Sequence, residues 1–367
     1  MYINPTKSNI HNFYMQIALK EAKKNLGNTS ENPSVGCVIT KDNTVISFGN
    51  TSLNGRPHAE LNAINSSLVN LNGSNLYVTL EPCSHYGETP PCVNLIVKKK
   101  IKRVFFSVLD PDLRSYNKCS KILKKKGIYV NRGICFKEAD FLYRSYKKSK
   151  NNLLPFVTSK LAVSLDFYTI NKKKEWITNE FSRGRVHLMR SFHDCIITSA
   201  RTIIKDNPRF TCRIDGLKHN TPSRIILDNK LKIRISSRII EKSINYRTII
   251  FFNKINKNKI KLLRKLKIKI YRIPLDNDGN IDLKKSLVKA KKLGFSRIFL
   301  ESGVKLTTNF LNKNLVDDLK IFMSNKYLRK NGDGNIKKYL GLFIKNKKKT
   351  IEKINLYGEK LISYKLK

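Results

Sequence analysis

The stretch Leu80–Cys92 reads L-E-P-C-S-H-Y-G-E-T-P-P-C, and the triplet His58-Ala59-Glu60 precedes it in the chain. Two cysteines and a histidine can supply three ligands to a tetrahedral zinc ion and leave the fourth position for water, as catalytic zinc sites do. A structural zinc would need a fourth protein ligand, and His85 is the nearest spare candidate. Glu60 lies two residues after the first ligand, so it could move protons beside the metal without binding it. We predict a catalytic site in which zinc is bound by His58, Cys83 and Cys92.

The order of these residues also carries a family resemblance. The pattern H-x-E followed by P-C and a second cysteine resembles the signature of the zinc nucleobase deaminases. In those enzymes water replaces a ring amino group, and the glutamate is the general acid and base. Those deaminases usually have two residues between the cysteines, whereas this chain has eight. An insert of that length resembles the amino-terminal half of the bifunctional deaminase/reductase family of riboflavin biosynthesis, RibD. The matching segments are Asn32–Ile39, Pro57–Glu60, Tyr77–His85 and Gly87–Cys92.

Later segments resemble the reductase half of the same family, whose fold is like that of dihydrofolate reductase. They are Pro155–Asp166, Glu175–Thr178, Thr198–Arg213, Ile225–Asp228, Leu300–Gly303 and Leu315–Asp318. The resemblance implies that NADPH binds at Ala162, Trp176, Thr202, Asp206 and Gly303, and that substrate binds at Arg190, Phe210, Arg213 and Glu301.

Simple chemistry supports phosphate binding in this second half. Arg190 and Arg213 could hold a phosphate as bidentate donors. Predicted helix starts at Thr202–Asp206 and Gly303–Thr308 could hold phosphate oxygens through backbone N–H groups. The half has no G-x-G-x-x-G after its first strand, so a Rossmann dinucleotide site is not predicted.

Several glycines of the family pattern are replaced in this chain. Asn117 and Cys119 stand at glycine positions in the predicted pocket loop Asp110–Cys119. Phe167 follows Ser-Leu-Asp where the family has glycine, and Asn171–Lys174 replaces a longer glycine-rich loop. Glycine adopts some backbone conformations at far lower cost than other residues. One alternative is therefore a deaminase whose reductase half survives only as a scaffold.

The hydrophobic pattern predicts alternating helices and strands. In the first half we expect strands at 35–40, 45–49, 75–80, 103–108 and 129–132, and helices at 11–25, 58–67, 93–99, 117–126 and 137–147. A chain of 367 residues exceeds one ordinary core. With the resemblance, this predicts a cytidine-deaminase-like three-layer α/β/α domain at 1–150 and a dihydrofolate-reductase-like α/β domain at 151–367.

The net charge of +46 would ordinarily suggest a nucleic-acid partner. The basic residues recur along the whole chain without interleaved aromatic residues, so we interpret most of them as solvated surface. An RNA-binding or RNA-editing deaminase remains the second alternative. The expected partner is a phosphorylated pyrimidine. Paired domains of this type often associate, so a homo-oligomer is one expectation and the oligomeric state stays open.

Cysteine usage and hydropathy bear on the compartment. The seven cysteines show no disulfide spacing, and we expect Cys37, Cys119, Cys135, Cys195 and Cys212 to be small core residues. The chain contains no apolar run of the length that spans a bilayer, and its start lacks the apolar segment of a signal peptide. Thiolate metal ligands suit a reducing compartment. We expect a cytoplasmic enzyme without membrane contact.

Overall fold

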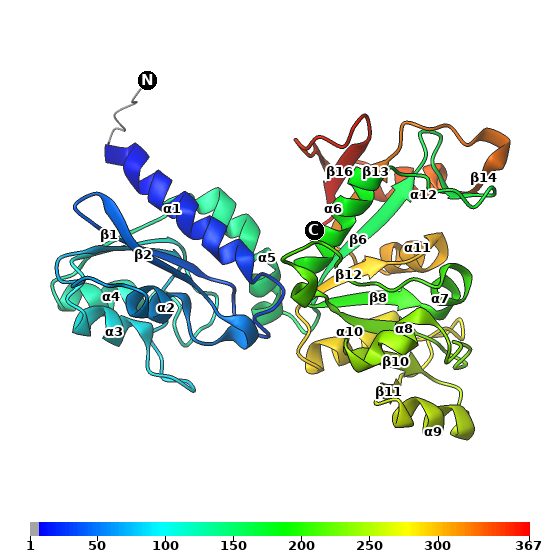
Figure 1. Ribbon diagram of the computed structural model, residues 1–367, viewed down its shortest axis with the longest axis horizontal. Helices are drawn as coiled ribbons and strands as arrows, with labels where there is room; N and C mark the ends of the chain where they lie inside the picture. The colour runs from blue at the N-terminus through cyan, green and yellow to red at the C-terminus, as the bar shows by residue number, and fades with distance from the viewer. Residues whose placement is uncertain (1–6) are drawn as a thin grey trace. The chain divides into compact units, whose positions relative to one another are not determined.

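The computed structural model describes residues 7–367, with the side chains of the first two of these left out. They form two compact units, the first ending at Asn152 and the second spanning Leu153–Lys367 (Figure 1). Part of the polar start considered for a signal peptide lies outside the described residues. Within the described range, none of the helices combines the length and the apolar character needed to cross a membrane.

A five-stranded sheet in the order β2-β1-β3-β4-β5 forms the centre of the first unit. Its strands are β1 (Gly36–Lys41), β2 (Thr44–Asn50), β3 (Asn75–Leu80), β4 (Arg103–Val108) and β5 (Tyr129–Arg132), which confirms the five predicted strands to within a residue or two. The strand β1 pairs antiparallel with β2 and β3, whereas β3, β4 and β5 run parallel. The segments that follow β3 and β4 therefore leave the sheet at the same edge.

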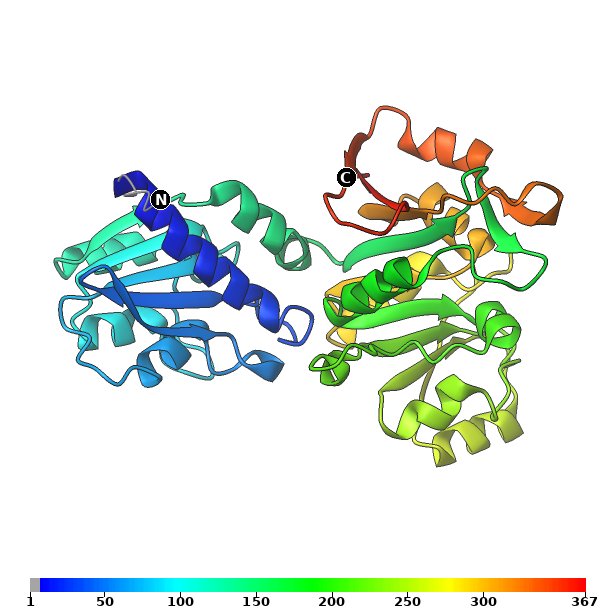
Figure 2. The ribbon, with the colours of Figure 1, turned by 45° about the horizontal axis from the view of Figure 1, so that its top comes forward.

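Helices cover both faces of this sheet (Figure 2). The helices α1 (Lys7–Lys24) and α5 (Phe136–Asn151) lie on one face, and α2 (Ala59–Asn65), α3 (Cys92–Lys98) and α4 (Cys119–Lys125) lie on the other. Two glycines allow close approach of helix and strand. A Cβ on Gly36 would meet the carbonyl oxygen of Ala18 in α1 at 1.9 Å, and one on Gly49 would meet the amide of Ala63 in α2 at 2.4 Å. The three-layer architecture is thus confirmed.

The second unit is built on a nine-stranded sheet in the order β11-β10-β9-β8-β12-β6-β13-β16-β15. Its strands are β6 (Phe156–Val163), β8 (Cys195–Ser199), β9 (Ser223–Leu227), β10 (Thr248–Phe252), β11 (Lys269–Arg272), β12 (Arg297–Glu301), β13 (Asp318–Met323), β15 (Lys348–Ile351) and β16 (Lys360–Lys365). The strands from β11 to β13 run parallel, and β16 and β15 close the sheet antiparallel. A separate two-stranded sheet pairs β7 (Tyr168–Asn171) with β14 (Gly332–Asn335).

Alternate residues of the central strands enter two cores. Ile225 packs with α10 (Leu283–Lys292) and α11 (Val304–Asn312) on one face, while its neighbour Ile226 packs on the other. That second core includes residues of α6 (Glu180–Ser191), α7 (Ala200–Asp206), α8 (Arg238–Glu241) and α9 (Lys257–Lys265). A further helix, α12 (Lys337–Ile344), packs through Leu340 on strands β6, β13 and β16.

Two expectations need correction. Cys135 is half-buried and accepts a hydrogen bond from the Gln16 amide, so it is not a core residue, although the other four cysteines named with it are buried. A helix start just after the strand 75–80 was expected to present Cys83, but Cys83 lies in a loop, because Ser84–Pro91 does not form a helix. The helix expected around Thr202–Asp206 is present as α7, and its first residue is Ala200.

The lost glycines did not remove the turns they belong to. Asn117, Phe167 and Lys174 have φ of 55°, 67° and 60°, so each adopts the left-handed conformation that glycine favours. Asparagine tolerates this conformation better than other residues do. Phe167 and Lys174 are expected to carry a larger backbone strain.

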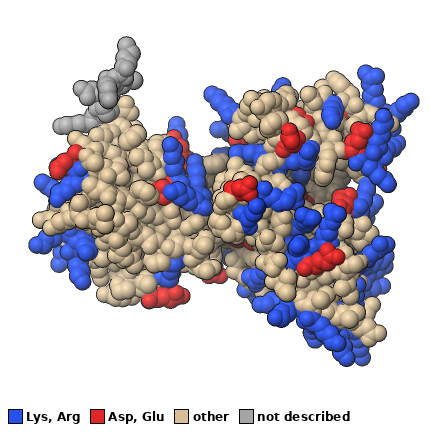
Figure 3. All heavy atoms as spheres, viewed as in Figure 1, with Lys and Arg blue, Asp and Glu red and all other residues tan. Residues whose placement is uncertain are grey.

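On the face that Figure 3 shows, lysine and arginine side chains occur on both units, with acidic groups between them. This distribution agrees with the interpretation of the basic residues as solvated surface.

Candidate active sites

Three candidate metal ligands from separate elements converge at the edge of the first sheet. His58 immediately precedes α2, Cys83 lies in the loop after β3, and Cys92 is the first residue of α3. The Nδ1 atom of His58 lies 3.6 Å from the Sγ atom of Cys83 and 3.4 Å from that of Cys92. A tetrahedral zinc with ordinary Zn–N and Zn–S bonds would separate such atoms by roughly 3.6 Å. The three side chains therefore fit zinc.

His85, the alternative fourth ligand, is not in this group. Within residues 7–367, the ligand atoms found within 4.8 Å of one another at this site belong to His58, Cys83 and Cys92. The Nδ1 atom of His85 instead lies 2.8 Å from the Ser115 hydroxyl. Three ligands leave a tetrahedral ion one open position, which favours a catalytic over a structural site.

The surroundings favour a thiolate at Cys83 and a proton carrier at Glu60. The backbone N–H of Cys92, at the start of α3, donates to the Cys83 sulfur at 3.2 Å. Hydrogen bonds from Cys92 and His58 lower the pKa of Cys83, against the effect of burial. Glu60 lies in the first turn of α2 and is buried. Burial and the nearby Cys83 raise the pKa of Glu60 well above its ordinary value, as proton transfer near neutral pH requires.

A buried carboxylate connects the metal loop to the predicted pocket loop. Glu81 directly precedes Pro82 and Cys83, and its side chain accepts backbone N–H groups of Asp110, Asn117 and Cys119 at 3.3, 2.9 and 3.0 Å. Helix α5 holds the same loop from another side. The Tyr146 hydroxyl donates to Asp110 at 3.1 Å, and Lys150 pairs with Asp112 at 3.1 Å.

The loop between the two cysteines is joined to the segment before His58 by Arg56. Its guanidinium donates to the Thr89 hydroxyl at 2.7 Å and pairs with Glu88 at 2.9 Å. Neither Arg56 nor Glu81 was among the sequence predictions. Two features of the sequence could have identified them: Arg56 is a basic residue two positions before a metal ligand, and Glu81 is an acidic residue directly before P-C.

In the second unit a buried ion cluster contains three predicted substrate residues. Arg190 donates to both carboxylate oxygens of Glu301, at 2.9 and 2.8 Å, and to the Thr211 carbonyl at 2.9 Å. Its guanidinium also lies 5.5 Å from the centre of the Phe210 ring. The arginine fork predicted to clamp phosphate is therefore engaged by Glu301 in this structure, and the phosphate role of Arg190 stays a prediction.

Lys160 completes this cluster and was missed by the sequence analysis. It lies opposite Glu301 in the parallel pairing of β6 with β12, and its Nζ atom is 3.7 Å from the carboxylate. Although burial opposes ionisation, Arg190 and Lys160 lower the pKa of Glu301 to about 2. The sequence signal that could have identified Lys160 is that it is the one charged residue of the strand Phe156–Val163.

The remaining predicted reductase residues are dispersed around this cluster. Arg213 is exposed, and its backbone N–H lies 3.3 Å from the Nδ1 atom of His187, which is itself 3.3 Å from Nη1 of Arg190. Asp206 is exposed at the end of α7, and Ala162 is half-buried on β6. Trp176 is 72% exposed and lies under the Arg183 guanidinium at 5.1 Å. One face of its indole is therefore covered by Arg183, while most of the side chain remains exposed.

The two predicted phosphate-binding helix starts differ. The Thr202 N–H already donates to the Ser199 hydroxyl at 3.2 Å, so this amide is not free for a phosphate. Gly303 precedes α11 with no side-chain cap, and a Cβ there would have no heavy atom within 4 Å. Space and a helix N-terminus at Gly303 fit a phosphate group of NADPH.

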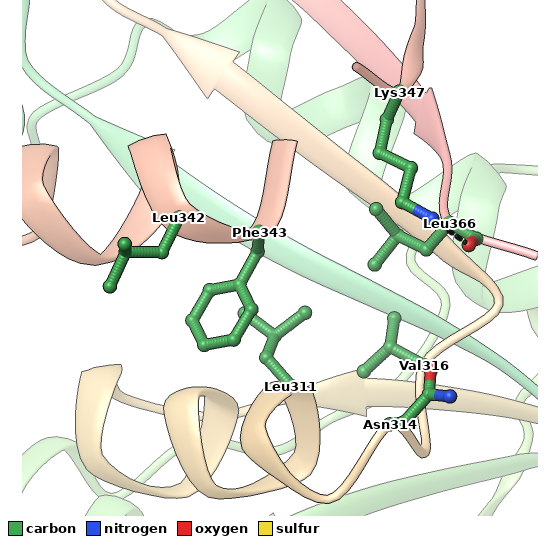
Figure 4. Close-up of a pocket in the computed structure, with 7 residues that line it drawn as sticks. All are labelled: Leu311, Asn314, Val316, Leu342, Phe343, Lys347 and Leu366. Atoms are coloured by element: carbon green, nitrogen blue, oxygen red, sulfur yellow. Dashed lines mark hydrogen bonds between the residues drawn. The ribbon is translucent and has the colours of Figure 1, made fainter. Parts of the chain in front are cut away.

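A separate apolar groove of about 260 Å³ lies in the second unit (Figure 4). It is lined by Leu311, Asn314, Val316, Leu342, Phe343, Lys347 and Leu366. None of the predicted site residues lines it, so we do not assign it to either reaction.

Comparisons with known proteins cover both units. Residues 8–108 match the cytidine and deoxycytidylate deaminase zinc-binding region, and residues 155–354 match the RibD C-terminal domain. The chain is 33% identical to the riboflavin biosynthesis protein RibD of Aquifex aeolicus (strain VF5), over 96% of this chain and 97% of that protein. It is 30% identical to RibD of Escherichia coli (strain K12), over 88% and 89%.

Solved structures agree over the full length. RibD of Acinetobacter baumannii matches with a TM-score of 0.82 and 27% identity, covering 98% of this chain and 99% of that one. A diaminohydroxyphosphoribosylaminopyrimidine deaminase/5-amino-6-(5-phosphoribosylamino)uracil reductase from Thermotoga maritima matches with a TM-score of 0.83 and 29% identity, with the same coverage.

Proposed function

The chain belongs to the RibD family of riboflavin biosynthesis, and on that premise we propose how its residues divide the family's two reactions between its two units. It is a bifunctional enzyme that deaminates a phosphoribosyl-diaminopyrimidinone and then reduces the ribosyl group to a ribityl chain, with zinc and NADPH as cofactors. We assign the deamination to residues 1–150 and the reduction to residues 151–367.

For deamination, His58, Cys83 and Cys92 hold the zinc. Zinc, when bound, supplies the positive charge that makes water nucleophilic near neutral pH. Glu60 takes a proton from the attacking water and returns it to the leaving amino nitrogen. Its place in the first turn of α2, next to the ligand that precedes the helix, keeps the carboxylate beside the reacting atoms.

The observation that carries this assignment is the convergence of the three ligand atoms at separations of 3.4 and 3.6 Å, with the buried Glu60 alongside. In addition, Glu81 ties the metal loop to the loop at 110–119. We propose that this second loop forms a wall of the pyrimidine pocket.

For reduction, we assign the substrate to the cluster of Arg190, Phe210, Arg213 and Glu301, joined by Lys160. NADPH, when bound, supplies the hydride for the ribose carbon. We place this cofactor along Ala162, Trp176, Thr202, Asp206 and Gly303. The Arg190–Glu301 pair orients the bound substrate, and Lys160 keeps a positive charge next to Glu301.

The two alternatives are less well supported. The intact Arg190–Glu301–Lys160 cluster argues against a reductase unit that is only a scaffold. The RibD likeness over nearly the whole chain argues against an RNA-editing deaminase. We propose that the enzyme acts on its small substrate in the cytoplasm, because seven free cysteines suit a reducing compartment. We also propose that it acts without nucleic acid and as a homo-oligomer.

One experiment tests both halves. Zinc-loaded full-length protein is given the pyrimidine substrate and NADPH, while ammonia release and nicotinamide absorbance are followed together. We expect both ammonia release and NADPH oxidation. Ammonia release alone would leave a deaminase with a silent second unit. The absence of both signals would overturn the assignment.

A further inference from the structure

Arg56 stands at the rim of the deaminase site with a partner that it can exchange. Arg56 lies two positions before the metal ligand His58, a span of at most about 7 Å along the chain. Its side chain is 28% exposed and reaches across to the loop between the two cysteines. There Nη1 donates to the Thr89 hydroxyl at 2.7 Å, and Nε pairs with Glu88 at 2.9 Å.

The other basic side chains near the metal loop are bound more firmly. Arg114 and Lys150 both pair with Asp112, at 2.6 and 3.1 Å, and the side chain of Asp112 is only 10% exposed. Glu88, by contrast, is 81% exposed. An ion pair with so exposed a carboxylate contributes little to stability, because water solvates both charges well. Arg56 can therefore give up Glu88 at little cost, and Glu88 can swing into solvent.

Gly87 lies beside Arg56 and carries no side chain that would block a ligand from the guanidinium. The Nη2 atom of Arg56 lies 3.6 Å, and the Nε2 atom of His85 4.0 Å, from the point where a Cβ on Gly87 would stand. A Cβ there would be in ordinary van der Waals contact with both nitrogens, so the space beside Gly87 is about the size of one carbon atom. The Thr89 hydroxyl accepts from Arg56 and keeps its own proton to donate.

A planar guanidinium and a hydroxyl are the donors that recognise a phosphate monoester. We propose that Arg56 and Thr89 bind the phosphate of the deaminase substrate, and that this phosphate displaces Glu88 from Arg56. The proposal rests on the proposed function, because it supplies the phosphate contact for the pyrimidine held at the metal. Glu88 then serves to hold Arg56 in place between turnovers.

The test compares two substrates in zinc-loaded full-length protein: the phosphorylated pyrimidine and the same compound without its phosphate. For Arg56→Gln we expect KM for the phosphorylated substrate to rise about 10- to 100-fold, because a charge-assisted bidentate contact is lost. The kcat should change little, and kcat/KM for the dephosphorylated compound should fall far less than kcat/KM for the phosphorylated substrate. For Arg56→Lys, which keeps the charge but loses the two-pronged guanidinium, KM for the phosphorylated substrate should lie between those of the wild type and Arg56→Gln.

Inorganic phosphate gives a second readout. It should inhibit the wild-type deaminase competitively and inhibit Arg56→Gln about tenfold less. The matched control is Arg103→Gln, which removes the same charge from an exposed residue at the opposite end of β4 from the site and should match the wild type. Glu88→Gln should lower KM for the phosphorylated substrate, because a competing carboxylate is removed.

An equal loss for both substrates with Arg56→Gln, or unchanged inhibition by inorganic phosphate, would overturn the proposal and leave Arg56 as a brace for the loop. Bound zinc, measured in each variant, shows whether the site has stayed assembled. A wild-type protein that releases no ammonia from either substrate would instead count against the proposed function.

Discussion

The two candidate sites differ in how far they are assembled before a ligand arrives. In the first unit, three ligand atoms already stand at zinc-like separations. His58 and Cys92 are held at helix starts, and Cys83 lies in the loop after β3. In the second unit, the acidic and basic groups of the site are paired with each other, and the cofactor residues are dispersed around them. A metal site demands strict geometry from few residues, whereas a site for a large cofactor distributes its contacts over many elements.

The largest effect should come from the single proton carrier. Glu60→Gln should retain zinc but lower ammonia release by about 10²- to 10⁴-fold, because the general acid–base step is lost. NADPH oxidation should stay at the wild-type rate when the deaminated intermediate is supplied. Glu138→Gln, an exposed change in the same unit, is the control. Full ammonia release by Glu60→Gln would contradict its role, and a parallel loss of reduction would show that the two sites are not independent.

In the second unit, removal of the buried carboxylate should affect both stability and reduction. Glu301→Gln leaves Arg190 and Lys160 without their shared anion, which should cost about 3–5 kcal/mol of unfolding free energy. We expect NADPH oxidation to fall and ammonia release to persist. Urea denaturation and the paired assay measure this, with the exposed Glu241→Gln as control. A variant as stable as the wild type would show that the cluster contributes nothing.

The same cluster predicts a pH dependence of stability. The pKa of Glu301 is lowered to about 2 from an ordinary 4.5. A lowered folded-state pKa gives stability that is fully present above pH 4.5 and is lost as the pH falls toward 2, on the order of 3 kcal/mol in all. The stability gap between wild type and Glu301→Gln should therefore narrow between pH 5 and 3. A constant gap across these pH values would argue against an ionised Glu301 in the folded state.

A smaller effect is expected for Glu81, which positions the pocket loop. Glu81→Gln places an amide N–H group against backbone donors, so the loop at 110–119 should loosen. We expect KM for the pyrimidine to rise about tenfold, with zinc content and NADPH oxidation unchanged. A drop in kcat together with loss of zinc would instead make Glu81 a support of the metal loop. Glu21→Gln, also buried in the first unit, is the control.

The smallest effects concern the replaced glycines. Lys174→Gly should stabilise the protein by about 0.5–1 kcal/mol, because the left-handed strain that glycine removes is larger than the entropic cost of introducing glycine. Asn117→Gly should gain nothing, since asparagine tolerates that conformation and Asn117 accepts a hydrogen bond from Arg132 at 3.0 Å. Thermal unfolding of the two variants gives the comparison. Equal shifts would mean that backbone strain is not what separates the two loops.

Short-range patterns made the metal site predictable from sequence. The helix predicted at 93–99 is α3, and Cys92 is its first residue. The spacing of His58 and Glu60 predicted that one helix start carries both. The loop conformation at Cys83 was not predicted, because the eight-residue insert that follows it is rich in proline and glycine and gives no periodic signal.

Long-range pairings could not be predicted in this way. Arg190 and Glu301 lie 111 positions apart, and their contact depends on the order of parallel strands in the sheet. Lys160 joins them only because β6 and β12 are neighbours in register. Family likeness supplied Arg190 and Glu301 singly, but their mutual pairing and the role of Lys160 needed the fold.

The end of α5 has a practical consequence for dividing the protein. This helix runs to Asn151, and the second unit begins at Leu153. Tyr146 and Lys150, near its end, hold the loop that carries Asp110 and Asp112. A fragment cut at residue 145 would lose both supports, whereas one that ends at Asn152 keeps them. Anyone who expresses the amino-terminal half alone should therefore place the stop codon after Asn152.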